Sequence, residues 1–368
     1  MNEIPKEIRL RRADGSECAE RPWQWGRDVD ERILVFGGTY LCDALKKLGF
    51  QVLHMGPGAH QGLVLEHPVT AARLWQLLAA RGFLPDAFFY ADNGNLPLLL
   101  NPEDVPCPSA FYSIDTYCNP WHIPYARGFD LALAAQKDHL QLFMGEGQSC
   151  RWLPLFYPGE PPSMPLWESR DVPVVFVGTL GHKNNPDRQP FLQGFKRRHP
   201  LVCRSGDYRP LFARSRIVLN QTAFSELNFR VFEAMAWGAA LLMEQCANGL
   251  TELFCPGENI LPPYPRNDAD AAAAAAATAL ADPVGLAAVA AAGQALVAAR
   301  HTALVRARTL VGLLRWVRTT EQWQTRLQAE HEVRRRAVHT AFGMLAGELV
   351  GPDWGSYREF FARVACGA

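Results

Sequence analysis

The sequence predicts an α/β protein made of two similar units, and three observations lead to this prediction. Residues 33–36 form an apolar run, residues 41–48 repeat apolar side chains at helical spacing, and residues 51–54 are expected to form a second strand. A strand-like run starts a second such unit at 174–178. Between the two, residues 158–173 hold five prolines, which exclude a helix or a central strand. Alternating strands and helices favour parallel sheets that helices cover on both faces.

The other elements follow from the same periodicities and, late in the chain, from helix propensity. Residues 269–300 are rich in alanine, the best helix former, so we expect helix with a break at 283–285. Residues 301–348 should also be helical, and their basic face is either a solvated surface or a membrane-surface contact. The remaining strands are expected at 86–92, 110–115, 129–136, 200–203, 216–220 and 239–243, and the remaining helices at 69–80, 187–197 and 228–237, with a short one ending at Phe143.

These elements divide the chain into five expected parts. They are an irregular lead-in at 1–30, an N-terminal domain at 31–157, a proline-rich linker at 158–173, a C-terminal domain at 174–300 and C-terminal helices at 301–368.

Composition narrows the class of protein. The chain has 368 residues, of which 48% are hydrophobic and 20% charged, enough for a sizeable core. Lys plus Arg equals Asp plus Glu at 37 each, so no dedicated nucleic-acid partner is expected. The nine cysteines include no C-x-x-C pair, which fits a reducing compartment. With no signal peptide and no run of 18 apolar residues, we expect a cytoplasmic protein without a transmembrane segment.

The segment at 215–264 carries the clearest chemistry. A buried strand leads to Asn228, a good N-cap for the next helix. The backbone amides of Phe229, Arg230 and Val231 would then be free at its first turn, and with Arg230 they form an anion site at the carboxyl end of a strand. Glu233 lies one turn further, where it could accept hydrogen bonds from a ribose. The alternative is a surface Arg230–Glu233 pair.

This segment resembles the glycosyltransferase group 1 family. The resemblance rests on NFRVFEAMAWGA at 228–239, GLTELF at 249–254 and PGE at 256–258. Within the family the chain is most similar to the CgeB-like branch, with weaker likeness at 174–188 and 111–138. The resemblance implies the GT-B fold, two Rossmann-like domains facing across a cleft with a C-terminal helix crossing back. It also implies sugar transfer from a nucleotide-diphosphate sugar, without a bound metal or another cofactor.

The resemblance also implies roles for two carboxylates. Many retaining members carry two Glu separated by seven residues, and Glu233 matches the second, which binds the ribose in them. The first would fall on Ser225, and Glu226 is one position away. Either Glu226 or the loop backbone would then contact the donor sugar.

A second loop, at 178–188, is expected beside the donor. Gly178 would let backbone approach a ligand, with Thr179 next to it. Lys183 and Arg188 could neutralise the departing diphosphate. The alternative is a polar surface loop in which Asn185 or Asp187 caps a helix.

The first domain offers candidates for the acceptor side. Gly37 and Gly38 follow the first strand, but a full G-x-G-x-x-G is absent, so no NAD site is expected. Asp115 ends a strand and could act as a base or cap the next turn. His122 could touch the donor sugar or pack within a loop. Asp92 is a weaker strand-end candidate.

Asp268 and Asp270 form a D-x-D triplet, the metal-binding pattern of other glycosyltransferases. They precede an alanine-rich helix, so capping is the expected role and no metal site is predicted.

Two alternatives to a transferase remain open. One is a GT-B protein that binds a nucleotide sugar but has lost catalysis, and the other is a sugar-nucleotide 2-epimerase. The sugar, the base and the acceptor (a glycan, a lipid carrier or a protein) are also open.

Overall fold

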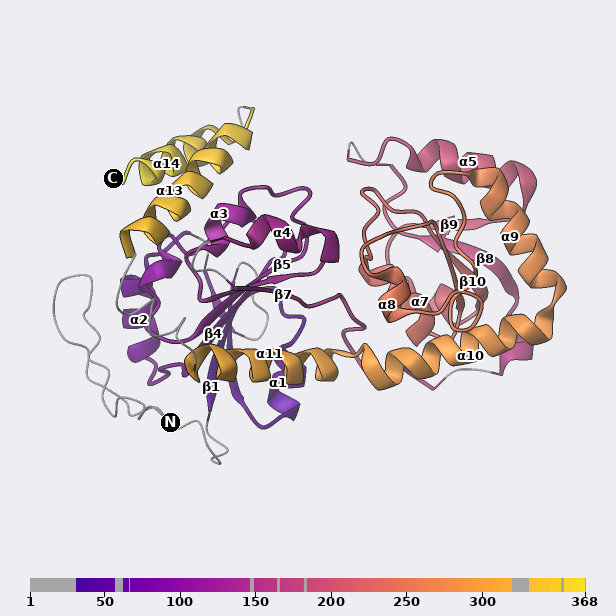
Figure 1. Ribbon diagram of the computed structural model, residues 1–368, viewed down its shortest axis with the longest axis horizontal. Helices are drawn as coiled ribbons and strands as arrows, with labels where there is room; N and C mark the ends of the chain where they lie inside the picture. Colours follow the sequence, from indigo (N-terminus) through magenta and orange to yellow (C-terminus); the bar gives the residue numbers. More distant parts are fainter. Residues whose placement is uncertain are drawn as a thin grey trace. The chain divides into compact units, whose positions relative to one another are not determined.

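The computed structural model describes residues 31–56, 62–65, 67–145, 149–163, 166–181, 184–319, 331–351 and 354–367. The expected lead-in at 1–30 lies outside the described residues. The chain forms two compact units, each with its own parallel sheet (Figure 1). Unit 1 comprises 1–135, 139–153 and 307–368, and unit 2 comprises 136–138 and 154–306. The domain boundaries expected from the sequence stay predictions.

The sheet of unit 1 has seven strands in the order β3-β2-β1-β4-β5-β6-β7, and every pairing is parallel. Its central strands are buried along their whole length, which explains why they read as continuous apolar runs. The strands are Arg32–Gly37 (β1), Gln51–Gly56 (β2), Leu63–Val64 (β3), Ala87–Ala91 (β4), Ser109–Ser113 (β5), Leu131–Ala134 (β6) and Ser149–Trp152 (β7).

Helices from both ends of the sequence cover this sheet. Helix α13 packs against α3 and α14, and its Phe342 lies in the same core as Phe36 and Phe111. In helix α11, Arg315 pairs with Glu31, next to the start of β1. The helices are Cys42–Lys47 (α1), Ala71–Ala79 (α2), His122–Ala126 (α3), Leu140–Phe143 (α4), Ala303–Thr319 (α11), His331–Glu348 (α13) and Gly355–Ala365 (α14).

Unit 2 holds a four-stranded parallel sheet in the order β11-β10-β8-β9. Helix α5 packs against α9, and α7 packs against α10. Its elements are Val172–Val177 (β8), Val202–Arg204 (β9), Ser215–Asn220 (β10), Ala240–Met243 (β11), Arg188–Arg198 (α5), Arg209–Phe212 (α6), Phe229–Ala236 (α7), Leu250–Leu253 (α8), Ala269–Ala281 (α9) and Pro283–Arg300 (α10).

Most expected elements are confirmed within a few residues, and the differences have physical reasons. The linker prediction ran to residue 173, but β8 already begins at Val172 because that residue pairs with Ser215 of β10. The break in the alanine-rich region is confirmed: α9 ends at Ala281, and the Asp282 side chain accepts from the Gly285 amide to cap α10. Helix α14 lies within the expected C-terminal helices, whereas strands β3 and β7 and helices α6 and α8 were not expected from the sequence.

Helix α10 bears on the expectation that no segment spans a membrane. Among the described residues it alone is long and apolar enough to cross a membrane by length and composition. Leu286, Ala290 and Val297 on it are buried, and it packs against α7 and β11. Because the core helix of a soluble protein passes the same test, this helix is weak evidence for a membrane span.

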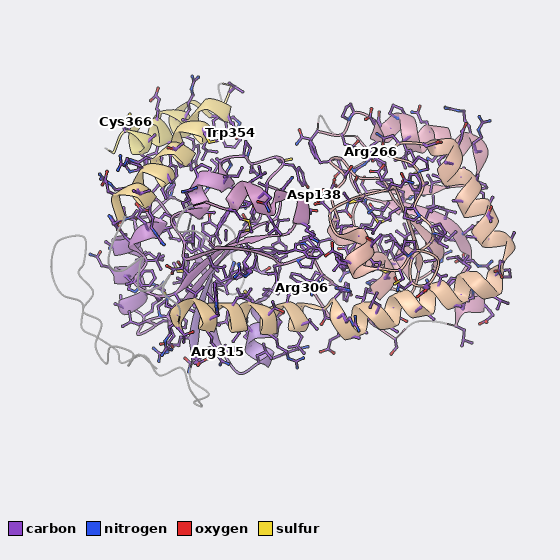
Figure 2. All side chains as sticks on the ribbon, in the orientation of Figure 1. Asp138, Arg266, Arg306, Arg315, Trp354 and Cys366 are labelled. Atoms are coloured by element: carbon purple, nitrogen blue, oxygen red, sulfur yellow. The ribbon has the colours of Figure 1, made fainter. Side chains whose placement is uncertain are left out.

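Buried Arg306 joins distant parts of unit 2 (Figure 2). Its Nε donates to the carbonyl of Pro154 at 2.7 Å, and its Nη2 lies 2.9 Å from Nδ1 of His301. The segment after β7 is thereby tied to the junction between α10 and α11.

Candidate functional site

The carboxyl ends of β8 and β10 hold most of the residues predicted to bind a donor. The loop after β8 contains Gly178 and Thr179, and the loop after β10 leads into α7. Ligands of open parallel sheets bind at this edge, because the loops and helix N-termini there present polar groups. Lys183, predicted to act from the first loop, lies outside the described residues.

Arg230 is fixed between the ends of the two strands. Its Nε donates to the carbonyl of Val177 at 2.7 Å, and its Nη1 donates to Oδ1 of Asn220 at 2.7 Å. The guanidinium lies 4.5 Å from the centre of the Phe176 ring. Burial, with Arg188 nearby, lowers the pKa of Arg230 to about 10, so it stays charged at neutral pH. The structure therefore holds a positive charge in a defined place at the sheet edge.

Arg188 has a different role from the one predicted. This buried guanidinium donates to the carbonyls of Thr179 and Gln221 at 3.0 and 3.1 Å, and its Nε donates to Oε1 of Gln221. These bonds join the loops after β8 and β10. We expected these donors to meet a diphosphate; three of the five N–H groups of Arg188 instead donate to protein oxygens, because a buried cation needs acceptors close by. Arg188 therefore holds the two loops together, and its part in binding a diphosphate stays a prediction.

The start of α7 also differs in detail from the prediction. Asn228 occupies the N-cap position with extended backbone, but its side chain exchanges hydrogen bonds with the Asn220 side chain instead of capping. The Val231 amide, expected to be free, donates to the carbonyl of Asn228 at 3.2 Å. Phe229 is half-buried with its ring against Phe156.

Glu233 lies one turn after Arg230 and has an unusual titration. Burial raises the pKa of its carboxyl to about 7, while the charge of Arg230 and a hydrogen bond from Tyr208 act in the opposite direction. The surface Arg230–Glu233 pair considered as an alternative is not what forms, because Arg230 is bonded to Val177 and Asn220 instead. Tyr208 was missed because no motif marks it.

Glu226 does not take the role considered for it. Its carboxylate is buried and accepts from the amides of Ala223 and Phe224 at 3.2 and 2.7 Å, which closes the loop on itself. Ser225, at the position of the missing Glu, has a positive φ of 59°. A side chain bonded to its own loop backbone is not available to a donor sugar, so the one-residue slip does not restore the carboxylate.

Two further groups around this loop were missed. Glu244 is fully buried and accepts from the Thr222 amide at 2.9 Å and from the Asn267 amide at 3.2 Å. Arg266, labelled in Figure 2, donates to the carbonyl of Ala223 at 2.7 Å. Glu244 follows β11 directly, so its position at a strand end is the sequence feature that could have identified it.

In unit 1, the backbone at Gly37 and Gly38, where β1 ends, lies close to the end of the neighbouring strand β4. Gly37 has a φ of +81°, and a Cβ on it would lie 2.3 Å from the carbonyl oxygen of Ala91. The Gly38 amide donates to that same oxygen at 2.9 Å. Nε2 of His54 donates to the carbonyl of Gly37 at 2.8 Å.

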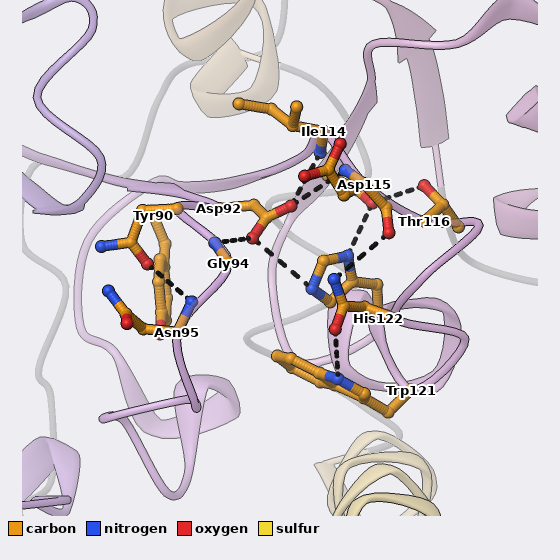
Figure 3. Close-up of polar contacts among 12 residues, drawn as sticks. Tyr90, Asp92, Gly94, Asn95, Ile114, Asp115, Thr116, Trp121 and His122 are labelled. Carbon is orange, nitrogen blue, oxygen red and sulfur yellow. Dashed lines mark hydrogen bonds and ion pairs between the residues drawn. The ribbon is translucent and has the colours of Figure 1, made fainter. Parts of the chain in front are cut away.

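Asp92 is the organising residue at this edge of the unit 1 sheet (Figure 3). The carboxylate is 4% exposed and accepts from the amides of Gly94, Ile114 and Asp115 at 2.8, 3.2 and 3.0 Å. The Asp115 side chain is half-buried and accepts from the Tyr117 hydroxyl at 2.7 Å. The structure thus brings Asp92 and Asp115 together, whereas from the sequence Asp92 was the weaker candidate for a site residue.

His122 is not a loop residue that reaches a sugar. It begins α3, is 1% exposed, and has Nδ1 2.9 Å from Oγ of Ser113 and Nε2 3.9 Å from Asp92. Burial lowers the pKa of His122 to about 4, although the charge of Asp92 acts in the opposite direction. The ring is therefore neutral at neutral pH. Its packing into the core, next to Trp121, corrects the prediction of donor contact.

Of the D-x-D triplet, Asp268 caps the helix as predicted, whereas Asp270 lies in the first turn of α9. The Asp268 side chain accepts from the Ala271 amide at 2.9 Å, and Asp270 pairs with Arg198 through two hydrogen bonds. No group of three His, Cys, Asp or Glu suited to a metal occurs within the described parts of the chain.

Comparison with known proteins supports a glycosyltransferase. Residues 166–312, which include the carboxyl ends of β8 and β10, match a family model described as glycosyl transferase-like. No curated protein sequence matches the chain. A solved glycosyltransferase from Rickettsia africae is similar in structure, with a TM-score of 0.58 and 10% identity over 79% of this chain and 99% of that chain. Sucrose-phosphate synthase from Thermosynechococcus elongatus has a TM-score of 0.58 and 12% identity over 78% of this chain and 99% of that chain. HepE from Anabaena, in complex with UDP and glucose, has a TM-score of 0.58 and 14% identity over 78% of this chain and 100% of that chain.

At these identities the neighbours establish the fold, which is GT-B. The family match covers residues 166–312, less than half of the chain, and is limited to that segment.

Proposed function

We propose that this chain transfers a sugar from a nucleotide-diphosphate sugar to an acceptor hydroxyl, and that it belongs to the CgeB-like branch of the group 1 family. The observation that carries the proposal is the placement of Arg230. A permanently charged guanidinium is held at the carboxyl end of β8, beside Gly178 and one turn before a carboxylate on the same helix. A cation suits a phosphate and a carboxylate suits a ribose diol, so the pair fits two parts of a nucleotide.

Each part of the donor has a proposed partner in unit 2. Arg230 and the first turn of α7 receive the diphosphate, because cations and helix N-termini attract phosphate oxygens. Glu233 accepts from the ribose hydroxyls. Charge on the leaving diphosphate is then balanced by Arg230, with Arg188 beneath the loops and Arg266 beside them. Side chains supply this charge, so transfer is proposed to need no metal.

Asp115 is the proposed base for the acceptor. It is half-buried, at the carboxyl end of β5, and its backbone amide is held by Asp92. A carboxylate so positioned can take the proton of an attacking hydroxyl. The HepE structures contain UDP, glucose and UDP-glucose, which is consistent with a nucleotide-sugar donor for this fold.

One observation favours a second function, a GT-B protein that binds a nucleotide sugar without transferring it. Ser225 replaces the first Glu of the family pair, and Glu226 is bonded to the loop amides. If the donor sugar needs that carboxylate, binding would persist while transfer is lost.

Calorimetry with UDP, GDP and ADP, and with the matching nucleosides, tests the donor site. The wild-type chain should bind one nucleoside diphosphate. Arg230→Ala should lower the affinity for the nucleoside diphosphate by about tenfold to a hundredfold. The affinity for the nucleoside should fall much less, since the proposed partner of Arg230 is phosphate. Arg198→Ala is the matched control, because Arg198 is exposed and pairs with Asp270. Equal binding by both variants would refute the site, and release of sugar from a labelled donor separates an enzyme from a binder.

A further inference from the structure

The proposed base, Asp115, begins a tight turn just after the carboxyl end of β5. Its carbonyl oxygen accepts from the amides of Cys118 and Asn119, both at 3.0 Å, and from Nδ2 of Asn119 at 3.2 Å. Its own amide donates to the buried carboxylate of Asp92 at 3.0 Å. The backbone of Asp115 is therefore held from both sides, and the orientation that a base needs is decided by its side chain.

Thr116 anchors the same turn to the core of unit 1. This side chain is 4% exposed, and its Oγ1 lies 2.6 Å from Oγ of buried Ser113 at the end of β5. The Ser113 hydroxyl in turn lies 2.9 Å from Nδ1 of His122. Figure 3 shows Thr116 beside Asp115 in this network. The turn cannot shift as a unit without breaking buried hydrogen bonds.

Tyr117, the next residue of the turn, bonds directly to the proposed base. Its hydroxyl donates to Oδ1 of Asp115 at 2.7 Å, a distance typical of a charged acceptor. The phenol is half-buried, and its ring lies beside that of His139, with the ring centres 6.4 Å apart. Because the backbone of the turn is fixed, a phenol bonded to one carboxylate oxygen holds the carboxylate in one orientation.

We propose that Tyr117 is a positioning residue, which holds the Asp115 carboxylate in the orientation from which it removes the proton of the acceptor hydroxyl. The inference rests on the proposed function and deepens it. In the transfer step the proton passes from the acceptor oxygen to the carboxylate, and that oxygen bonds to the anomeric carbon. The bond from this carbon to the diphosphate breaks, and its electron pair leaves with the diphosphate. The phenol gives up no proton in this step.

The hydrogen bond from Tyr117 has two effects on the rate, which act in opposite directions. It orients the carboxylate, which speeds proton removal, and it stabilises the charged form, which makes the carboxylate a weaker base. Orientation should dominate, because a misplaced base loses much of the factor of about 10²–10⁴ that general base catalysis contributes. Tyr117→Phe should therefore lower kcat by about tenfold and leave the KM for the donor unchanged, since the proposed donor partners lie in unit 2.

The experiment measures sugar release to water by the wild-type chain, Tyr117→Phe, Asp115→Asn and the double variant. The probe is the nucleoside diphosphate that calorimetry selects, carrying labelled glucose, galactose, mannose or N-acetylglucosamine. Tyr125→Phe is the matched control, because it removes a phenol oxygen of the same unit that donates to the carbonyl of Leu99 at 2.7 Å, not to Asp115. Thermal unfolding measures the stability of each variant separately.

A lower kcat for Tyr117→Phe with an unchanged donor KM supports the proposal, provided that the loss disappears in the Asp115→Asn background, as it must if Tyr117 acts through Asp115. Tyr125→Phe should lower the melting temperature and keep the wild-type kcat.

An unchanged or raised kcat in Tyr117→Phe, or an equal loss in both backgrounds, overturns the role of Tyr117 and leaves Asp115 as the base. Full activity of Asp115→Asn overturns both roles and leaves the donor site standing. A wild-type chain that binds the donors and releases no sugar overturns the proposed transfer itself, and the role of Tyr117 falls with it.

Discussion

The guanidinium of Arg230 occupies the space that a side chain on Gly178 would need. A Cβ at Gly178 would lie 2.1 Å from Nη2 of Arg230, closer than such atoms approach in proteins. The glycine is thus required by a specific neighbour, since its φ lies outside the left-handed region. The pair joins the end of β8 to the first turn of α7.

Gly178→Ala should displace Arg230 and weaken diphosphate binding by about tenfold, because the cation loses its fixed position. Gly347→Ala is the control: a Cβ there would meet nothing within 4 Å, and helix α13 should gain about 0.5–1 kcal/mol from the replacement. Calorimetry and thermal unfolding on both variants check this. Unchanged affinity in Gly178→Ala would show that the position of Arg230 is unimportant for the ligand.

Glu233→Gln should stabilise the fold at high pH and weaken the binding of the donor. The folded-state pKa of Glu233 is about 7, above the ordinary 4.5, so ionisation costs stability as pH rises through that window. At pH 8 the variant should gain about 1–3 kcal/mol in its free energy of unfolding, and at pH 4.5 almost nothing. Urea unfolding at the two pH values measures the difference. An equal effect at both would contradict the burial of a charged carboxylate.

Substitutions at Asp92 and Asp115 should affect different properties. A change at Asp92 should lower stability, and a change at Asp115 should lower sugar transfer. Asp92→Ala leaves the amides of Gly94, Ile114 and Asp115 without their acceptor, so the free energy of unfolding should fall by about 3–5 kcal/mol. Asp115→Asn keeps an oxygen for Tyr117 and should change stability by about 1 kcal/mol or less, yet abolish most transfer. Full transfer by Asp115→Asn would remove it as the base.

Release of sugar from the donor should survive EDTA, since the positive charge at the site comes from arginines. Asp268→Ala should lower helix stability by about 1 kcal/mol through the lost cap, with donor release unchanged. Activity assays with and without chelator, together with thermal unfolding of the variant, check both points. Loss of activity in EDTA and its recovery with Mn²⁺ would assign the aspartates a metal role instead.

The sequence alone was enough for the fold class and for the position of helix α7, which carries the proposed donor residues. Buried parallel strands read as apolar runs, and helices read at their 3.6-residue spacing, so β1, β8, β10 and α7 could be predicted in place. Arg230 and Glu233 could be singled out because both lie on one short helix, where spacing fixes their separation. Strands β3 and β7 and helices α6 and α8 escaped because segments of two to four residues lack that periodic signal.

Only the tertiary structure decided what each polar group bonds to. Glu226 and Glu233 are both carboxylates in one segment, yet one closes its own loop and the other faces Tyr208, which arrives from the segment after β9. Likewise Arg188 serves two loops while Arg230 fills the space beside Gly178. Hydrogen-bond partners, burial and hence pKa values depend on which segments the sheet brings side by side, and sequence spacing carries no record of contacts between distant segments.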